Sequence, residues 1–403
     1  MDRKVYAERL SELVLNKGVA LEKGDYLNIV VSPDAYFYGR VMAEYAYRMG
    51  AKYVNIRVSD MRLDKVRSKL QNREDLSYIP SSFTSYVEEG LKTGIKNVRI
   101  DCADERLEDI DFDQDNYQTL NQAFRKAQKE LSAKYMGNEI KWCVAVAPGP
   151  VWAEKVLGKG KKEEDLADVL ASILHIDTPD FLSLWDEEDR VSKKRVDYLN
   201  SLRIRKLHFK SPVTDFTVGF RKEAFYEGGS SETVNGSVFW PNLPTAEIFC
   251  TPDNSEAEGY ITTTKTVNVL GTDTEKVMLT FKGGKCISVK AEKGQEVMEK
   301  YLSIDEGSSR LGEVALVDTD SPISRTGLTF GSILIDENAS CHIALGQGYS
   351  SNLHIGDKDP KDYGCNESLV HTDFMVGSPD MSITALTYDG EEVKIMEDGH
   401  FLF

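Results

Sequence analysis

The order of apolar and polar residues in the first two hundred positions alternates between a strand period and a helix period. Short β-rich apolar runs predict strands at 25–31, 53–58, 97–102 and 141–147. Apolar residues at a spacing near 3.6 predict helices at 35–49, 84–92, 117–135, 163–174 and 180–207. A strand–helix–strand unit implies parallel strands joined by a right-handed crossover. The first half is therefore predicted to be an open α/β domain with a mostly parallel sheet and helices on both faces.

The pattern changes close to Phe209. From Thr214 onward, glycine turns separate strand-like runs, which lie at 259–270, 276–281 and 285–290. The pair Gly283-Gly284 between the last two runs predicts a hairpin. We predict two domains, an α/β domain at 1–210 and an α+β, mainly antiparallel domain at 211–403. The boundary is expected between 205 and 215.

Composition excludes several classes of function. The chain has 403 residues, a formal net charge of −17 and 41% apolar residues, so it is too apolar for wholesale disorder. Its negative charge would repel phosphate backbones and anionic lipid, so we expect neither nucleic acid nor a membrane as partner. The N-terminus has no apolar signal region, and the six scattered cysteines contain no CxxC pair. We therefore expect a cytoplasmic protein with reduced thiols.

Histidine is concentrated near the C-terminal end of the sequence. Four of the six histidines fall there, namely His342, His354, His371 and His400. Because side chains two positions apart share one face of a strand, His371 and Asp373 can act together. Glu337 precedes His342 by five residues, and an apolar run follows. His342 and its neighbour Cys341 would face opposite sides of that strand, so we interpret the cysteine as a core thiol.

Two further acidic residues open or enter apolar runs in the same half. Glu247 follows the turn at 242–245, and Glu313 enters the run at 311–317. A carboxylate in such surroundings must be paired, protonated or bound to metal, because an isolated buried charge is too costly. Taken singly, each is more simply an edge-strand acid. Taken with Glu337, His342, His371 and Asp373, they supply about the ligand set needed for two adjacent divalent cations.

The four segments that carry these residues resemble the thermophilic aminopeptidase family of dinuclear metallopeptidases, the group of aminopeptidases T and S and PepS. The resemblance covers essentially the whole chain and is closest at 336–349 and 371–379. It implies metal ligands at Glu247, Glu313, Glu337, His342, His371 and Asp373, and a catalytic tyrosine at Tyr349. All seven positions carry the expected residue type, although Gly346-Gln347-Gly348 is a more glycine-rich approach to the tyrosine than the family leads us to expect.

The resemblance also implies an activity. The protein would be a metal-dependent aminopeptidase that hydrolyses N-terminal amino acids from peptides with a free N-terminus, using water activated by two divalent ions. Zinc, cobalt or manganese suits carboxylate and imidazole ligands. Glu313, or as a second choice Glu337, would act as general base, and Tyr349 would donate a proton to the oxyanion. The family further suggests a homodimer.

Two other classes of function stay open at this point. One is a different dinuclear metallohydrolase, such as a dipeptidase or an amidohydrolase, with the same metals and another substrate. The other is a non-enzymatic two-domain protein that binds a metabolite where the order of its parallel strands reverses. The six-residue ligand set and the missing export signal argue against the second class.

Overall fold

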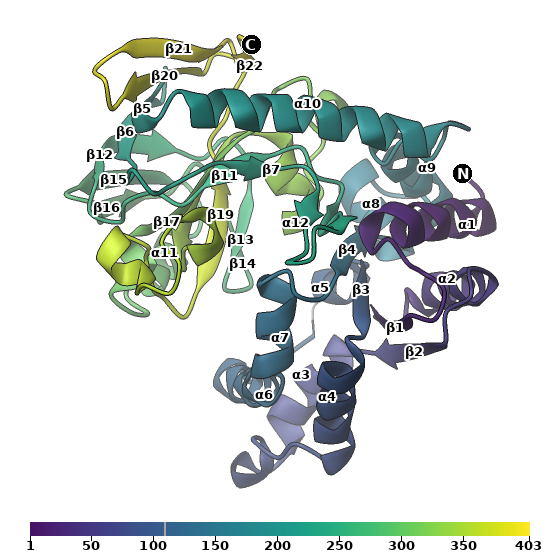
Figure 1. The fold of residues 1–403 in the computed structure, drawn as a ribbon. Helices are drawn as coiled ribbons and strands as arrows, with labels where there is room; N and C mark the ends of the chain where they lie inside the picture. Colours follow the sequence, from purple (N-terminus) through teal and green to yellow (C-terminus); the bar gives the residue numbers. More distant parts are fainter. Residues whose placement is uncertain (109) are drawn as a thin grey trace. The chain divides into compact units, whose positions relative to one another are not determined.

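The computed structural model describes residues 1–108 and 110–403, which form two compact units (Figure 1). Unit 1 comprises Met1–Trp185 and Ser230–Leu243, and unit 2 comprises Asp186–Gly229 and Pro244–Phe403. The chain therefore enters unit 2, returns briefly to unit 1 and enters unit 2 again. The single domain boundary expected between 205 and 215 stays a prediction.

Unit 1 is built on a five-stranded sheet in the order β10-β4-β3-β1-β2, in which every described pair of strands is parallel. Its strands are β1 (Tyr26–Val31), β2 (Tyr53–Val58), β3 (Lys96–Asp101), β4 (Trp142–Val146) and β10 (Asn242–Leu243). The four predicted strands and their parallel pairing are confirmed. The pattern missed β10, because two residues are too short to show a period. A small ribbon, β8 (Ser231–Glu232) with β9 (Val238–Phe239), precedes it.

Helices lie on both faces of this sheet. A Cβ placed on Gly39 of α2 (Tyr36–Arg48) would meet Val31 Cγ1 at 2.8 Å, so α2 packs closely on one face. Arg57 of β2 points to the face opposite to that of Val31. It lines one cavity together with Phe83 of α4 (Ser81–Thr93), so α4 lies on this second face. The remaining helices that begin in unit 1 are α1 (Arg3–Leu13), α3 (Met61–Leu70), α5 (Asp104–Leu107), α6 (Gln114–Ala127), α7 (Lys129–Met136), α8 (Pro150–Leu157), α9 (Glu163–Ile173) and α10 (Phe181–Ser201).

Two of the predicted helices were wrong in extent. The helix expected at 117–135 is divided into α6 and α7 at Gln128, whose φ of −105° and ψ of 11° depart from helical values. The helix expected at 180–207 ends at Ser201, and strand β5 (Ile204–Ser211) begins three residues later. Ile204 and Leu207 have helical spacing, which misled the prediction, but Leu207 and Phe209 alternate into a buried core as strand residues.

Unit 2 contains a five-stranded sheet, β19-β18-β17-β11-β7, and an eight-stranded sheet, β16-β15-β12-β6-β5-β20-β21-β22, both antiparallel in their described pairs. The predicted run at 259–270 is interrupted between β12 and β13, whereas the Gly283-Gly284 hairpin joins β15 to β16 as expected. The bounds are β6 (Thr214–Gly219), β7 (Glu227–Gly228), β11 (Ile248–Cys250), β12 (Ala257–Thr262), β13 (Val267–Val269), β14 (Thr272–Thr274), β15 (Met278–Lys282), β16 (Lys285–Lys290), β17 (Leu311–Leu316), β18 (His342–Gly346), β19 (His371–Met375), β20 (Ser382–Thr387), β21 (Glu392–Glu397), β22 (His400–Phe401), α11 (Gln295–Leu302) and α12 (Ile333–Asp336).

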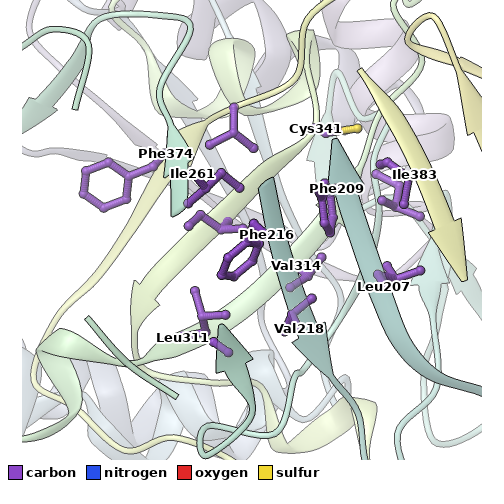
Figure 2. Packing of buried hydrophobic residues seen from close by; sticks show 14 of the residues in the cluster. Leu207, Phe209, Phe216, Val218, Ile261, Leu311, Val314, Cys341, Phe374 and Ile383 are labelled. Carbon is purple, nitrogen blue, oxygen red and sulfur yellow. The ribbon is translucent and has the colours of Figure 1, made fainter. Parts of the chain in front are cut away.

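The core of unit 2 draws on both of these sheets (Figure 2). Phe209 and Phe216 of the eight-stranded sheet belong to the same buried cluster as Val314 and Phe374 of the five-stranded sheet. Each fully buried large apolar side chain contributes about 1.5–3 kcal/mol to folding. This core fixes which face of the five-stranded sheet is turned toward the other sheet and which is turned away. Among residues 1–108 and 110–403, no helix is both long enough and apolar enough to cross a bilayer.

Candidate metal centre

The candidate site residues lie on the face of the five-stranded sheet that is turned away from the core. Val314 of β17 and Phe374 of β19 enter the core, so their neighbours Glu313 and Asp373 point the other way. The same alternation turns His342 of β18 away from the core. The alternation of apolar and polar positions in these strands therefore places the acids and imidazoles together on one face of the sheet.

Strand register aligns two of the carboxylates. Glu313 lies opposite Ala344, and Ala344 lies opposite Asp373, so the three form one row across β17, β18 and β19. The small methyl group of Ala344 leaves space between the two acids. The ladder of β17 is irregular between Leu311 and Glu313, which is the kind of bulge that redirects a side chain.

Two overlapping groups of potential ligands result. The Nε2 atom of His342 lies 3.2 Å from a carboxylate oxygen of Glu247 and 4.0 Å from one of Glu313. The Nε2 atom of His371 lies 3.3 Å from oxygens of both Glu313 and Asp373. Within each group all ligand atoms lie within 4.8 Å of one another. Glu313 belongs to both groups, so its two oxygens lie between the two imidazoles.

Backbone carbonyls orient both imidazoles. The Nδ1 atom of His371 lies 2.7 Å from the carbonyl oxygen of Gln347, and that of His342 lies 3.3 Å from the carbonyl oxygen of Ser340. When Nδ1 donates to a carbonyl, Nε2 is left to face the carboxylates. This arrangement is typical of metal-ligating histidine. The donors are carboxylate oxygens and imidazole nitrogens without thiolate, a set that fits zinc, cobalt or manganese.

The site concentrates negative charge in a buried place. Burial raises the pKa of Glu313 to about 7, and the charges of Glu247 and Asp373 act in the same direction. Burial lowers the pKa of His342, but its hydrogen bond to Glu247 and the charges of the surrounding carboxylates together outweigh that effect, and the pKa reaches about 9. His371 likewise reaches about 11 through Asp373 and Glu313. In the metal-free protein the imidazolium groups therefore offset part of the acidic charge, which cations would offset more fully.

Glu337 lies beside these two groups rather than in them. It belongs to the short 3₁₀ turn 337–339, which precedes β18. Burial and the charges of Glu247 and Asp373 raise its pKa well above the usual value, so its carboxyl is within electrostatic reach of the centre. Of the six predicted ligands, five belong to the two groups that share Glu313, and Glu337 belongs to neither.

Tyr349 lies at the edge of the centre, in the segment after β18. Its hydroxyl oxygen is 3.4 Å from His371 Nε2, and its ring meets that of Phe249 edge to face with the centroids 5.8 Å apart. Burial and the charge of Glu313 raise its pKa well above 10, so the phenol keeps its proton. Thr251 Oγ1 donates to the Tyr349 carbonyl oxygen at 2.8 Å and accepts from its N–H at 3.1 Å.

Sequence reasoning did not find the groups that support the site. The Thr251 hydroxyl and the carbonyl of Gln347 were both missed, as was the buried amide of Asn338, which accepts hydrogen bonds from the N–H groups of Ala246 and Glu247. These contacts depend on which loops meet in the fold, and no spacing along the chain predicts them. The only feature of the sequence that could have pointed to Asn338 is its position directly after Glu337.

The other histidines of the C-terminal half are engaged elsewhere. His354 stacks on Phe225 with the ring centroids 4.0 Å apart. His400 Nδ1 lies 3.0 Å from an oxygen of Asp318 and 3.5 Å from one of Asp320. This third acidic group is partly exposed and Asp318 also pairs with Arg195, so it differs from the buried centre. Cys341 contacts Val317 in the core, as its position beside His342 predicts.

Comparisons with known proteins agree with these observations. The family model described as thermophilic metalloprotease (M29) matches residues 4–401. Aminopeptidase T of Thermus thermophilus is 34% identical over 98% of this chain and 98% of its own. Aminopeptidase AmpS of Bacillus subtilis is 32% identical over 98% of this chain and 97% of its own. The solved structure of wild-type AmpT from Thermus thermophilus matches all of both chains with a TM-score of 0.91 and 34% identity.

Proposed function

The chain belongs to the thermophilic metalloprotease (M29) family and is a metallo-aminopeptidase, and we propose that two divalent ions act at the buried centre built around Glu313. The observation that carries the proposal is the pair of three-residue groups that share this carboxylate. A carboxylate that belongs to both groups could serve two adjacent divalent ions at once.

The six ligands divide between the two ions according to their contacts. Glu247 and His342 would hold one ion, and His371 and Asp373 the other, with Glu313 between them. Glu337, whose pKa is raised by burial and by the charges of Glu247 and Asp373, would complete the set. When bound, the ions supply Lewis-acid polarisation of the scissile carbonyl and of the attacking water. The donors suit zinc, cobalt or manganese.

The chain's own groups supply the proton transfers. A carboxylate of the centre takes the proton of the attacking water at an Oε atom and returns it to the leaving amine. Such a base needs an oxygen that the ions leave free. Glu313 is the first candidate because of its central position, on condition that one of its oxygens stays free, and Glu337 is the second because it lies outside both contact groups. Tyr349 keeps its phenolic proton and lies 3.4 Å from His371 Nε2, so it can donate to the developing oxyanion.

Hydrolysis of leucyl-p-nitroanilide by chelated and metal-reloaded protein tests the proposal. Chelation is expected to abolish activity, and cobalt, zinc or manganese to restore it. Elemental analysis should then find two ions per chain, falling together with activity in His371→Ala. The matched control is His354→Ala, because this histidine stacks on Phe225 and has no contact with the centre. Two ions and full activity in His371→Ala would disprove the site assignment.

The substrate class is tested separately. An aminopeptidase requires a free α-amine, so N-acetyl-leucyl-p-nitroanilide is expected to react at least about a hundredfold more slowly than the free-amine substrate. Equal rates would point instead to an amidohydrolase, and activity confined to dipeptides would point to a dipeptidase with the same metals.

Assembly and compartment are also part of the proposal. The family resemblance supports a homodimer, and the six free, buried cysteines fit the reducing cytoplasm. Light scattering coupled to size-exclusion chromatography should give twice the chain mass of 45.2 kDa. A mass of one chain at micromolar concentration would contradict the dimer.

A further inference from the structure

A second feature of the molecule lies in unit 1, on the face of the parallel sheet that α4 covers. The face of a buried parallel sheet is normally apolar. Here Asn55, Asn28 and Asn97 lie side by side on β2, β1 and β3. The amide of Asn55 donates to Asn28 at 2.8 Å, and that of Asn28 donates to Asn97 at 2.7 Å. The sheet therefore presents a hydrogen-bonded polar row where core packing would be expected.

A cavity of about 700 Å³ is present at this face, between β2 and α4. This volume is within the range of small-molecule sites, about 300–1,000 Å³. Much of its wall is aromatic, formed by the rings of Tyr26, Tyr53, Phe83, Tyr86 and Phe124. Asn55 and Arg57 are the polar groups that β2 contributes. The cavity is thus apolar in its walls and polar at one side.

Arg57 is the unusual group of this cavity. Its guanidinium carbon lies 5.5 Å from the ring centroids of both Phe83 and Tyr86. Its Nε atom is buried and has no hydrogen-bond acceptor, and the guanidinium has no ion pair, among residues 1–108 and 110–403. Arg62, in the same unit, pairs with Asp34, Glu105 and Glu108. A buried N–H without an acceptor costs about 1–3 kcal/mol, and a ligand that accepts from it would recover this cost.

We propose that this cavity binds a small aromatic carboxylate. The carboxylate would accept from the Nε–H of Arg57 and from its terminal N–H groups, the arrangement that guanidinium forms most favourably. The flat apolar body would pack among the rings of Phe83 and Tyr86. The cavity is lined by residues of unit 1 alone and contains none of the candidate metal ligands, so the inference goes beyond the peptidase activity.

The charges around the cavity select against other ligands. A cation would be repelled by Arg57 and by Lys52, whose ammonium lies 4.9 Å from the centroid of Tyr26. A neutral ligand would leave the guanidinium without a counter-charge. A phosphate dianion would need a second cation beside Arg57, but Lys52 precedes β2 whereas Arg57 lies near the end of that strand. Glu89 among the lining residues also opposes a second negative charge.

Isothermal titration of the metal-loaded protein with 3-phenylpropionate tests the proposal, with 3-phenylpropionamide as the neutral isostere. Arg57→Gln removes the charge, and Arg40→Gln is the matched control, since Arg40 is an exposed arginine of α2 that does not line the cavity. We expect the acid to bind at least about tenfold more tightly than the amide, the effect of one charge-assisted hydrogen bond. Arg57→Gln should lose this preference, and Arg40→Gln should keep it.

A carboxylate can also bind at the metal centre, and the variants separate the two sites. Binding at the metal is untouched by Arg57→Gln, so only the component lost in that variant reports on the cavity. Should Arg57→Gln fail to fold, as judged by circular dichroism and peptidase activity, Phe83→Leu tests the aromatic wall and is expected to weaken binding about tenfold. The proposal is overturned if the acid shows no binding at about 10 mM. It is also overturned if wild type and these variants bind the acid identically.

Discussion

The amide of Asn338 connects two of the acidic segments of the metal centre. Its Oδ1 accepts hydrogen bonds from the N–H groups of Ala246 at 2.6 Å and Glu247 at 3.2 Å, and its Nδ2 donates to the carbonyl oxygen of Leu334 at 3.0 Å. The side chain is fully buried. Asn338 therefore holds the start of β11 against the turn that carries Glu337, and it positions two candidate ligands without touching a metal.

Replacing Asn338 by Ala is expected to weaken metal binding. Loss of a group that orients metal ligands typically costs about 10–100-fold in affinity, and the two freed N–H groups become unsatisfied. Titration against a competing chelator measures the affinity of the variant. Asn268→Ala is the control, because that amide pairs with Asp273 at an exposed position of β13. Unchanged metal affinity in Asn338→Ala would show that the two segments hold their positions without this amide.

Removing the Tyr349 hydroxyl tests its role in catalysis. Tyr349→Phe keeps the ring packing against Phe249 and deletes the proton donor. If the phenol stabilises the oxyanion, kcat should fall about 10²–10³-fold with KM little changed. Tyr260→Phe, at an exposed position of β12, should match the wild type. A change in KM alone would instead identify Tyr349 as a substrate-binding residue.

Local sequence predicts the candidate ligands unevenly. His371 and Asp373 share a strand, so the two-residue period alone places them together, and the structure keeps their atoms 3.3 Å apart. Glu247 and Glu313 are 66 positions apart, and only the pairing of β11 with β17 brings them to one site. For Glu247, Glu313 and Tyr349 the resemblance to a known family supplied what local pattern could not. Neither the local pattern nor the resemblance predicted the supporting groups, such as Asn338.

At the scale of the elements, the sequence pattern found strands reliably where apolar residues were contiguous. It was wrong where two periods overlapped, as at 204–209, and it missed strands of two residues such as β7 and β10. Short strands are stabilised by their partners in the sheet rather than by their own residues. The two-residue strand β7 pairs with β11, which follows Glu247, so an element without local signal supports the site.

Gly346 ends β18 in a conformation that only glycine adopts without strain. Its φ is +112°, and a Cβ there would lie 2.0 Å from the carbonyl oxygen of Val370. Gly346→Ala is therefore expected to lower the free energy of unfolding by about 2–4 kcal/mol, measured by thermal unfolding. Gly283→Ala, with φ +57° and open space around the Cβ, is the control and should cost about 1 kcal/mol. Equal effects of the two changes would contradict the predicted clash at the β18–β19 pair.

Glu105 of α5 is expected to make the stability of unit 1 depend on pH. Burial raises its pKa from 4.5 to about 7, and the charges of Asp60 and Asp34 add to that effect while Arg62 opposes it. Between these two values the unfolded chain has released the proton that the folded protein retains, so stability falls as pH rises from about 4.5 to 7.

Glu105→Gln should remove this dependence on pH. The difference in unfolding free energy between pH 5 and pH 8 is expected to shrink by about 1–3 kcal/mol relative to the wild type. Denaturant unfolding at both pH values measures it. Glu89→Gln, an exposed residue of α4, is the control. If Glu105→Gln kept the full wild-type slope, the buried carboxyl would not be the source of the effect.

At the scale of the whole molecule, the acidic residues have two different physical effects. The chain carries a net charge of −17, which favours solubility and disfavours contact with other polyanions. Unit 2 gathers Glu247, Glu313, Glu337 and Asp373 in one buried place, where the same sign of charge becomes a cost that cations relieve. The stability of this unit should therefore depend on metal far more than that of unit 1.

The stabilisation by metal should itself depend on pH, and the sign follows from the histidines. In the metal-free protein the pKa of His342 is about 9 and that of His371 about 11, above their ordinary 6.5. Their charged contacts with the carboxylates stabilise the metal-free fold fully below about pH 6.5, and this contribution is lost as pH rises through 9 to 11. Metal binds neutral imidazole, so binding must release these protons and becomes tighter at higher pH.

Calorimetric unfolding of chelated and cobalt-loaded protein at pH 6, 7, 8 and 9 measures the effect. At a fixed concentration of free cobalt, the increase in Tm is expected to grow from each pH to the next higher one. Bound metal adds RT ln(1 + [L]/Kd) to the stability, and this quantity rises as Kd falls with increasing pH. His371→Ala should reduce both the increase and its slope with pH, since one of the two displaced protons is gone. His354→Ala, whose ring stacks on Phe225, should behave as the wild type. A cobalt-induced rise in Tm that stays constant from pH 6 to 9 would mean that protons and metal do not compete for these two imidazoles.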